Sequence, residues 1–468
     1  MGKVQPARRI LSPFSAIPPV QSNRARLTGP GRGAQNRGMV ESLRFHPVRS
    51  RRAPAAAVND VRAAVGEALA AIRPLLADVP PGAPVAVTCG SRGIDRIAEV
   101  VRAACAVLRE AGAWPFVVPA MGSHGGATAD GQRRVLADYG VAEALIGAPI
   151  VSSMETVSLG RTPEGIEVFM DRAAAEAGRV LALNRVKPHT DFDGEVESGL
   201  LKVLAVGLGK VEGAMSFHRS SLRLGFDKVV LAMGQHVLAS GKVLAGLGLV
   251  ENERHLLCEV AAAPAAQVEA LDRRLLLRAR QLYPKLPFAS LDLLIVDEIG
   301  KNISGSGLDT KVVGRAVHPD RAPRGMGDAI RIRRIYIRDL TPESEGNAIG
   351  MGLADVMHQR IARKADLGAM YTNSRTAYGC AAARMPMHFP NDREALQFLM
   401  GNLGQPPPER LRAAWILNTL SVGDFLATPA CAADLAGNAD YAIEPAVPLE
   451  FDGAGDLLAA APAEGGDT

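Results

Sequence analysis

The sequence predicts an α/β protein made of two layered domains. Three observations support this class. The chain has 468 residues, more than one hydrophobic core usually organises. From about residue 58, short apolar runs alternate with amphipathic segments. Polar, glycine-rich loops follow several of the apolar runs. We therefore expect two Rossmann-like α/β domains, with the active site in the cleft between them.

The first domain is predicted to span residues 41–255. Thr128 can cap one of its helices, and Gly112 can adopt the left-handed conformation that ends another. Strand-end loops at 89–93 and 121–126 are expected at the ligand-binding edge of the sheet. The predicted elements are a helix over 60–78, a strand over 84–88, a helix over 95–111, and strands over 115–119 and 179–183.

The second domain is predicted to span residues 256–454. A polar loop at 297–302 follows its first buried strand. Residues 455–468 are rich in Ala, Gly and Asp and are expected to fray. The predicted elements are a helix over 258–283, strands over 291–296 and 330–337, and a helix over 347–363.

The N-terminal segment 1–40 is predicted to be a disordered basic extension. Residues 1–52 carry eleven Lys or Arg and one acid, Glu41, in a Pro- and Gly-rich context without periodicity. A transit peptide, a basic tail, or an upstream stretch before a true start at Met39 would each explain it. The rest of the chain is net acidic, so we expect no nucleic-acid partner.

Membrane and disulfide-rich classes are not indicated. No run of eighteen apolar residues occurs, so no membrane partner is expected. The five cysteines are scattered and contain no CxxC pair, which disfavours a disulfide framework or a thiolate zinc site. A reducing cytoplasm is the expected compartment.

Three histidines and a lysine carry the strongest chemical signal. His124 lies in a glycine-rich loop, His189 follows Lys187-Pro188 after a strand, and His218 comes after the apolar setting of Lys202. Imidazoles bind metals and move protons, and a desolvated amine is nucleophilic. A capping histidine and a snorkelling lysine are the structural alternatives. The other six histidines are expected to be structural or exposed: His46, His236, His255, His318, His358 and His388.

Two cations in strand-end loops are further candidates. Arg92, between Ser91 and Gly93, precedes a predicted helix and can clamp a carboxylate or phosphate. Lys301 can bind a substrate carboxylate or pair with Glu298 or Asp297 nearby.

The chain resembles the nickel-pincer-nucleotide-dependent lactate racemase family of 2-hydroxyacid racemases and epimerases, over roughly residues 42–430. Short motifs in a characteristic order carry the resemblance: GSRGI at 90–94, GSHGG at 122–126, KPH at 187–189, Lys202, His218 and DEIGK at 297–301.

The resemblance implies an isomerase that inverts C2 of a 2-hydroxy acid by reversible hydride transfer to a nickel-pincer nucleotide. It implies Lys202 as the lysine that tethers the cofactor and His218 as the nickel ligand. His124 and His189 would be the acid/base pair, one for each face of the substrate. Enzymes that mature the cofactor would be partners.

The remaining site residues follow from the same resemblance. Arg92 and Lys301 are expected on the substrate carboxylate and on cofactor groups. Three residues are expected beside the cofactor: Ser91, Gly93 and Glu298.

One segment departs from the family pattern. Between His189 and Lys202 the chain is long and acidic. Its carboxylates are expected to line the pocket and to favour a polyhydroxy acid such as a sugar acid: Asp191, Asp193, Glu195 and Glu197.

Three other functions remain open from the sequence. The chain can be an NAD-dependent 2-hydroxyacid racemase or oxidoreductase without nickel. It can be a zinc hydrolase that uses His124, His189 and His218 as ligands. It can also be a binding protein without turnover.

Overall fold

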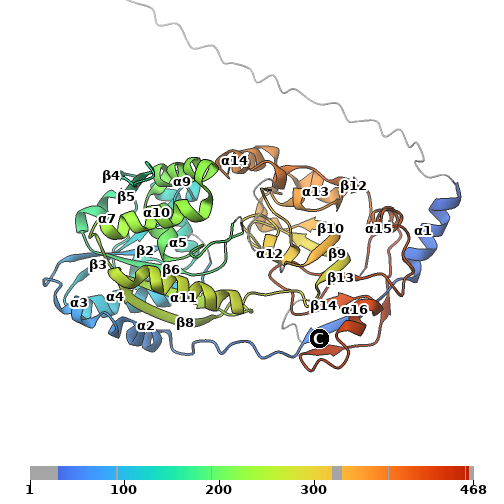
Figure 1. Ribbon diagram of the computed structural model, residues 1–468, viewed down its shortest axis with the longest axis horizontal. Coiled ribbons are helices and arrows are strands. Elements are labelled where there is room, and N and C mark those ends of the chain that lie inside the picture. The colour runs from blue at the N-terminus through green and yellow to red at the C-terminus, as the bar shows by residue number, and fades with distance from the viewer. Residues whose placement is uncertain are drawn as a thin grey trace, which may run out of the picture.

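The computed structural model describes residues 30–90, 93–190, 192–318, 329–377, 379–458 and 460–462. It confirms the predicted class, because the chain forms two α/β units, one built on a mostly parallel sheet and the other on a mixed sheet, with helices against both (Figure 1). A small antiparallel pair, β4 (Thr156–Arg161) and β5 (Glu167–Asp171), stands beside the first unit.

The first sheet has the strand order β3-β2-β6-β7-β8. The first four strands run parallel and β8 is antiparallel to β7. Its strands are β2 (Pro84–Cys89), β3 (Trp114–Pro119), β6 (Val180–Arg185), β7 (Val243–Glu251) and β8 (Leu257–Pro264). Its helices are α2 (Val61–Ala70), α3 (Arg73–Ala77), α4 (Ile97–Glu110), α5 (Ala129–Asp138), α6 (Glu143–Ile146), α7 (Arg172–Ala177), α8 (Leu200–Lys202), α9 (Lys210–Leu224), α10 (Phe226–Ala239) and α11 (Val268–Gln281).

Strand β6 shows why this sheet has two cores. Successive side chains of a strand point to opposite faces. Val180 and Ala182 accordingly belong to one buried cluster, and Leu181 and Leu183 to the other. A strand that is apolar on both faces has to be covered on both sides, which the helices do.

The second sheet has the strand order β12-β11-β10-β9-β13-β14-β1-β15, with β16 paired to β1. The segment from β12 to β13 is parallel and the rest is antiparallel. Its strands are β1 (Arg44–Ser50), β9 (Ser290–Ile299), β10 (Arg331–Leu340), β11 (Val356–His358), β12 (Met387–Phe389), β13 (Ala413–Ile416), β14 (Phe425–Ala427), β15 (Tyr441–Ile443) and β16 (Val447–Pro448). Its helices are α1 (Pro30–Ser42), α12 (Thr310–Val313), α13 (Gln359–Lys364), α14 (Leu367–Ala377), α15 (Asp392–Asn402) and α16 (Pro429–Asp434).

Three predicted helices need correction. The helix over 60–78 is broken into α2 and α3, because Pro74 lies in the first turn of a new helix that begins at Arg73. The helix over 258–283 starts with strand β8, which pairs with β7 before α11 begins. The helix predicted over 347–363 is shorter in the structure. The α-helix begins at Gln359 and ends at Lys364, and strand β11 precedes it.

Both ends of the chain also differ from expectation. Residues 30–40, expected to be disordered, lie in helix α1, which packs against α15. Residues 455–458 and 460–462, expected to fray, are tied to the core: Leu457 N–H donates to Asp392 (2.8 Å) and Ala461 N–H to Asp297 (2.7 Å). Residues 1–29 and 463–468 lie outside the described part of the chain.

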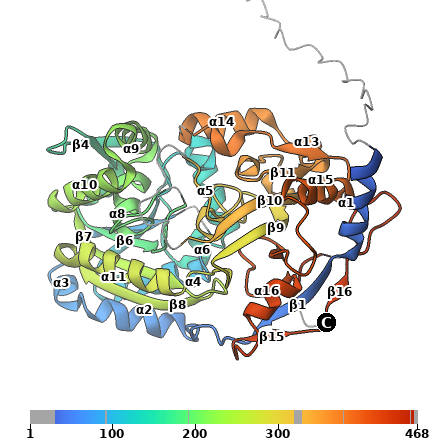
Figure 2. The same ribbon diagram turned by 45° about the vertical axis from the view of Figure 1, so that its right-hand side comes forward.

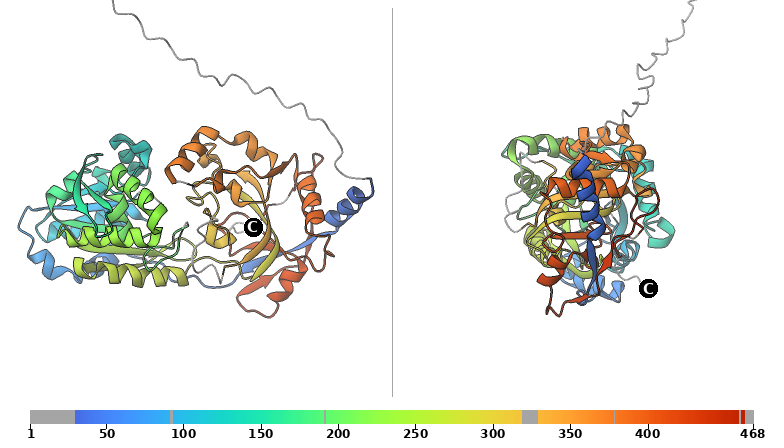
Figure 3. Two further views of the ribbon diagram at one scale, coloured as in Figure 1. Left: turned by 45° about the horizontal axis from the view of Figure 1, so that its top comes forward. Right: turned by 90° about the vertical axis from the view of Figure 1, so that its right-hand side faces the viewer.

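The chain passes between the two sheets at positions other than the predicted domain boundaries. Strand β1, from the predicted first domain, lies between β14 and β15 of the second sheet. Strand β8 and helix α11, from the predicted second domain, complete the first unit. The segment after β1 therefore crosses to the first unit and the segment after α11 crosses back, as two views show (Figure 2, Figure 3).

Among the described residues, none of the helices is both long enough and apolar enough for a membrane crossing. All five cysteines are free thiols.

A buried guanidinium organises the second unit. Arg338 of β10 donates to Asp297 (2.5 Å) and, through two nitrogens, to Asp392 (3.1 and 3.0 Å). It also lies over the ring of Trp415, 5.2 Å from the centroid, and donates to the carbonyl of Leu457. Burial alone would raise the pKa of Asp392, but the hydrogen bonds and charge of Arg338 hold it below its ordinary value.

We expect Arg338→Met to lower the free energy of unfolding of the second unit by about 3–5 kcal/mol, because it leaves two buried carboxylates without their counter-charge. Urea denaturation followed by the fluorescence of buried Trp415 measures this. As the control, Arg333→Met removes the exposed ion pair to Asp292 and should cost less than about 1 kcal/mol. Equal losses for the two variants would contradict the expectation.

Candidate active site

His189 lies in a closed loop at the carboxyl end of β6. After the strand ends at Arg185, Lys187 and Ser198 exchange two backbone hydrogen bonds of 2.8 and 3.2 Å. Residues 188–197, which we call the His189 loop, therefore begin and end next to each other. The carboxyl edge of a parallel sheet is where such folds bind ligands, so the loop has the position that the sequence predicted.

Buried Glu197 holds the His189 loop from inside. Its side chain is inaccessible to solvent, and its carboxylate accepts the N–H of His189 (2.5 Å) and of Gly194 (3.2 Å). The guanidinium of Arg280, on α11, donates to the same carboxylate over 2.5 Å. A buried carboxylate is stable only with such partners, so these contacts define the path of the loop.

The acidic side chains that the structure describes in this loop all form ion pairs. Asp193 pairs with Lys311, and Glu195 pairs with Arg273. The expectation that these carboxylates line a pocket and select a polyhydroxy acid is therefore not supported for Asp193, Glu195 or Glu197. Asp191 lies outside the described residues.

The second unit contacts the His189 loop through α12. The hydroxyl of Thr310 donates to the carbonyl of Thr190, and Lys311 contacts Asp193. Asp309 caps this short helix by accepting the N–H of Lys311 (2.9 Å). The loop that carries His189 is thus held by both units.

Lys202 ends the short helix α8, whose start is fixed by a buried carboxyl group. Asp272 of α11 accepts the N–H of Leu201 (2.9 Å), and a Cβ at Gly199 would lie 1.9 Å from its Oδ1. Glycine is therefore required at 199. Burial raises the pKa of Asp272 to about 6, against the hydrogen bonds from the helix start.

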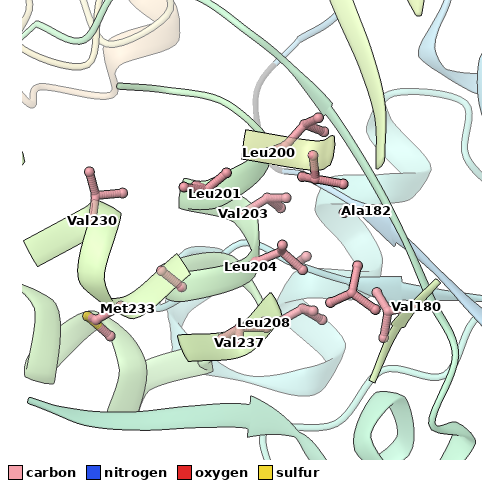
Figure 4. Close-up of a cluster of buried hydrophobic side chains, with 14 of the residues drawn as sticks. Val180, Ala182, Leu200, Leu201, Val203, Leu204, Leu208, Val230, Met233 and Val237 are labelled. Carbon is pink, nitrogen blue, oxygen red and sulfur yellow. The ribbon is translucent and has the colours of Figure 1, made fainter. Parts of the chain in front are cut away.

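The apolar side of this segment is packed into the core. Helix α8 continues into the π-helical turn Val203–Gly207. Figure 4 shows Leu200, Leu201, Val203 and Leu204 between the side chains of β6 and α10. Packing on that side fixes the backbone and leaves half-buried Lys202 on the other.

The Lys202 amine contacts His189. Its Nζ lies within hydrogen-bond distance of Nε2 of the imidazole. A protonated lysine can only donate, so Nε2 is then the acceptor and the ring proton is on Nδ1. The structure therefore brings together a predicted tethering lysine and a predicted acid/base histidine from separate motifs.

His218 joins them through an aromatic cluster. The ring of His189 stacks on Phe192, with centroids 4.4 Å apart, and Phe192 stacks on Phe226 at 5.7 Å. His218 meets the same Phe226 edge-on, with centroids 6.4 Å apart. His189 and His218 thus contact one pair of stacked phenylalanines, and Lys202 is linked to this pair through His189.

His318 is a further imidazole at this phenylalanine pair, although its sequence predicts a structural or exposed residue. Its ring stacks on Phe226 with centroids 5.7 Å apart, and the side chain is 8% exposed. Its sequence setting, Ala316-Val317-His318-Pro319, contains neither a glycine-rich loop nor a polar motif. The local sequence therefore held no signal for its position.

The His124 loop is supported by a buried lysine. Fully buried Lys210 pairs with Asp171 (3.3 Å) and donates to Gln132, whose amide donates to the carbonyls of Gly122 and His124. Burial lowers the pKa of Lys210, and Asp171 opposes that shift. The N–H of Gly122 donates to Gly207, so this loop lies against the turn that follows Lys202. His124 itself is exposed.

The predicted anion loop is described only in part. Ser91 and Arg92 lie outside the described residues. Gly93 is exposed, next to the start of α4. Their predicted roles remain predictions.

Lys301 and Glu298 lie in the second unit. The Lys301 amine donates to the carbonyl of Gly305 (2.6 Å) and to Asn373 on α14 (2.8 Å), and α14 contacts α9, the helix of His218 (Figure 1). Glu298 instead belongs to β9 opposite Asp339, and burial followed by neighbouring acids raises its pKa. The described contacts connect Lys301, but not Glu298, to the elements around His218.

Another group with metal-ligand chemistry occurs in the second unit. The ligand atoms of His358, Asp392 and Asp456 lie within 4.8 Å of one another. His358 contacts Asp456 (2.9 Å), and both oxygens of Asp392 accept from Arg338. These contacts already explain the cluster as part of the buried network around Arg338.

A cleft between the units stays a prediction. Two surface hollows contain none of the predicted site residues; one is lined by Arg37, Asn391, Arg393, Glu394, Gln397, Ala454 and Gly455, the other by Gly314 and residues 329–333.

Comparison with known proteins gives distant likenesses. No protein-family model matches the chain, and no curated protein matches it. A solved structure from Thermotoga maritima is 15% identical, with a TM-score of 0.44, over 59% of this chain and 70% of that one. The lactate racemase apoprotein from Thermoanaerobacterium thermosaccharolyticum is 12% identical, with a TM-score of 0.41, over 80% and 88% of the two chains. Likenesses of this extent identify neither a family nor an activity.

Asp272 should make stability depend on pH. Its pKa is raised from 3.8 to about 6 by burial, so between these values the folded carboxyl stays protonated while the unfolded one ionises. Stability therefore falls as pH rises through this window. We expect the difference in unfolding free energy between the wild type and Asp272→Asn to change by about 3 kcal/mol between pH 3.5 and 7. Parallel pH curves would contradict this.

Lys311 should hold the His189 loop. We expect Lys311→Met to speed amide hydrogen exchange in residues 187–198 by about tenfold, because Asp193 loses its ion pair and buried Glu197 loses a nearby charge. Exchange followed by mass spectrometry measures this. Lys364→Met, which removes an ion pair to Asp339 instead, is the matched control and should leave the loop unchanged.

Proposed function

We propose that the chain is a racemase or epimerase that inverts C2 of a 2-hydroxy acid by reversible hydride transfer to a nickel-pincer nucleotide tethered to Lys202. The contact between Nζ of Lys202 and Nε2 of His189 carries the proposal. A group attached to this amine starts beside an imidazole that can take or return a proton, as the reaction requires.

The donors around the aromatic cluster fit such a cofactor. A primary amine is available for the covalent link, and an imidazole, which suits nickel, is available on His218. The amine contacts His189, whose ring stacks on Phe192, and His218 contacts Phe226. When bound, the cofactor would accept the hydride of C2 and return it to the opposite face.

His189 is proposed to act on the proton of the 2-hydroxyl group. Glu197 holds its backbone N–H and Phe192 holds its ring face, so the imidazole is oriented before substrate binds. Inversion needs a second base for the second face, and we assign this role to His124 on the loop beside Gly207.

Lys301 is proposed to bind the substrate carboxylate together with Arg92. Its ammonium is fixed by Gly305 and Asn373, which makes it a preorganised cation. A carboxylate held at one end leaves C2 and its hydroxyl to be oriented toward the bases. Ser91 and Gly93 would contact cofactor phosphate at the loop before α4.

The test is production of the chain together with cofactor-maturation enzymes, followed by intact mass, nickel content and racemisation assays on a panel of 2-hydroxy acids. We expect an adduct of a few hundred daltons and stoichiometric nickel. Lys202→Ala should lose the adduct and reduce racemisation to background, because no amine remains for attachment. The control, Lys228→Ala, changes an exposed lysine of α10 and should keep both.

His218→Ala separates metal binding from attachment. We expect the organic adduct to survive while nickel content falls at least about tenfold, since an imidazole ligand is lost. An unmodified, nickel-free wild type that racemises with added nicotinamide dinucleotide would instead favour the NAD-dependent alternative. An active Lys202→Ala enzyme would overturn the tether.

A further inference from the structure

His318 is a buried imidazole that the second unit places against the first. It follows α12, the helix whose Thr310 and Lys311 contact the His189 loop. Its ring lies at 30° to Phe226 with centroids 5.7 Å apart. His318 therefore contacts the same phenylalanine as His218, although His218 lies in α9 of the first unit and His318 follows α12 of the second.

The Nε2 atom of His318 is buried, and among the described residues it makes no hydrogen bond. Nearly all buried polar atoms in native proteins have a partner, so each exception requires an explanation. The stack on Phe226 accounts for the face of the ring but not for this nitrogen. A role in packing alone would be served equally well by an apolar ring.

The backbone beside this nitrogen bears no side chain. A Cβ at Gly379 would lie 3.5 Å from Nε2 and 2.9 Å from Cε1 of His318. Any larger residue would press on the ring edge. Glycine at 379 therefore lets the backbone pack closely beside the ring edge that carries the buried Nε2 atom.

Three imidazoles converge on the paired rings of Phe192 and Phe226. His189 stacks on Phe192, while His218 and His318 contact Phe226. Hydrogen bonds on an apolar, partly dehydrated surface are stronger than in water. Such a surface suits a small acid whose oxygens need fixed partners.

We propose that His318 is a substrate-binding residue whose Nε2 hydrogen-bonds an oxygen of the bound hydroxy acid. This inference rests on the proposed function and extends it, because it gives the second unit a contact with the substrate besides that of Lys301. Docking of the second unit then completes the binding site, since Nε2 enters it only when α12 lies on the His189 loop.

Two substitutions separate hydrogen bonding from packing. His318→Phe keeps a ring against Phe226 and removes Nε2, whereas His318→Gln removes the ring and keeps a polar group near that position. The probes are lactate, malate and gluconate, and calorimetry on the cofactor-loaded protein selects the acid that the wild type binds most tightly. Thermal unfolding shows that each variant is folded.

We expect His318→Phe to bind the selected acid about 10- to 100-fold more weakly while keeping adduct, nickel and unfolding temperature, and His318→Gln to recover part of the affinity. Wild-type affinity in His318→Phe, or the reverse order of the two variants, would overturn the role of Nε2. A wild type with no adduct and no acid binding would overturn the proposed function itself, and with it this inference.

Discussion

The candidate site depends on one buried carboxylate. Glu197 satisfies its charge with the guanidinium of Arg280 and with backbone N–H groups, including that of His189. Because a charge without partners is very costly inside a protein, the loop can follow only a path that supplies those donors. The position of the imidazole next to Lys202 is a consequence of that path. The charge of Glu197 thus positions the backbone of the reactive group, and the stack on Phe192 holds its ring.

Most of the first unit could be predicted from local patterns. Helix α4 ends where Gly112 follows it, and the runs around Val87 and Val117 are buried on both faces as parallel strands require. The chain ends could not be predicted, because strand β1 pairs with residues hundreds of positions away and the tail near Leu457 bonds to Asp392, 65 positions away. Such pairing leaves no mark in a local window. The run of alanines in β8 likewise favours a helix until its partner β7 is known.

Part of the candidate site could also be predicted, because some of its residues lie in distinctive local motifs. Histidine and lysine in glycine- and proline-containing loops are conspicuous, and the sequence predicted site roles for His189 and Lys202, which the fold brings into contact. The sequence also predicted a pocket-lining role for Asp193 and Glu195, whose ion-pair partners Lys311 and Arg273 are distant in sequence. The sequence does not show these partners, so the two carboxylates resemble ligand-binding groups. In the fold, both form ion pairs in the His189 loop. His318 was missed because only tertiary structure brings it to Phe226.

The place of β1 in the second sheet has a consequence for biosynthesis. His46 pairs with Ala427, so about 380 residues separate partners in neighbouring strands. At the usual pace of a ribosome, β1 leaves the exit tunnel roughly 20 to 80 s before β14 exists. During that interval its backbone N–H and C=O groups have no strand to pair with, while the first unit can already fold. A nascent chain of this protein therefore carries an open strand, which is a natural target for chaperones that hold extended segments.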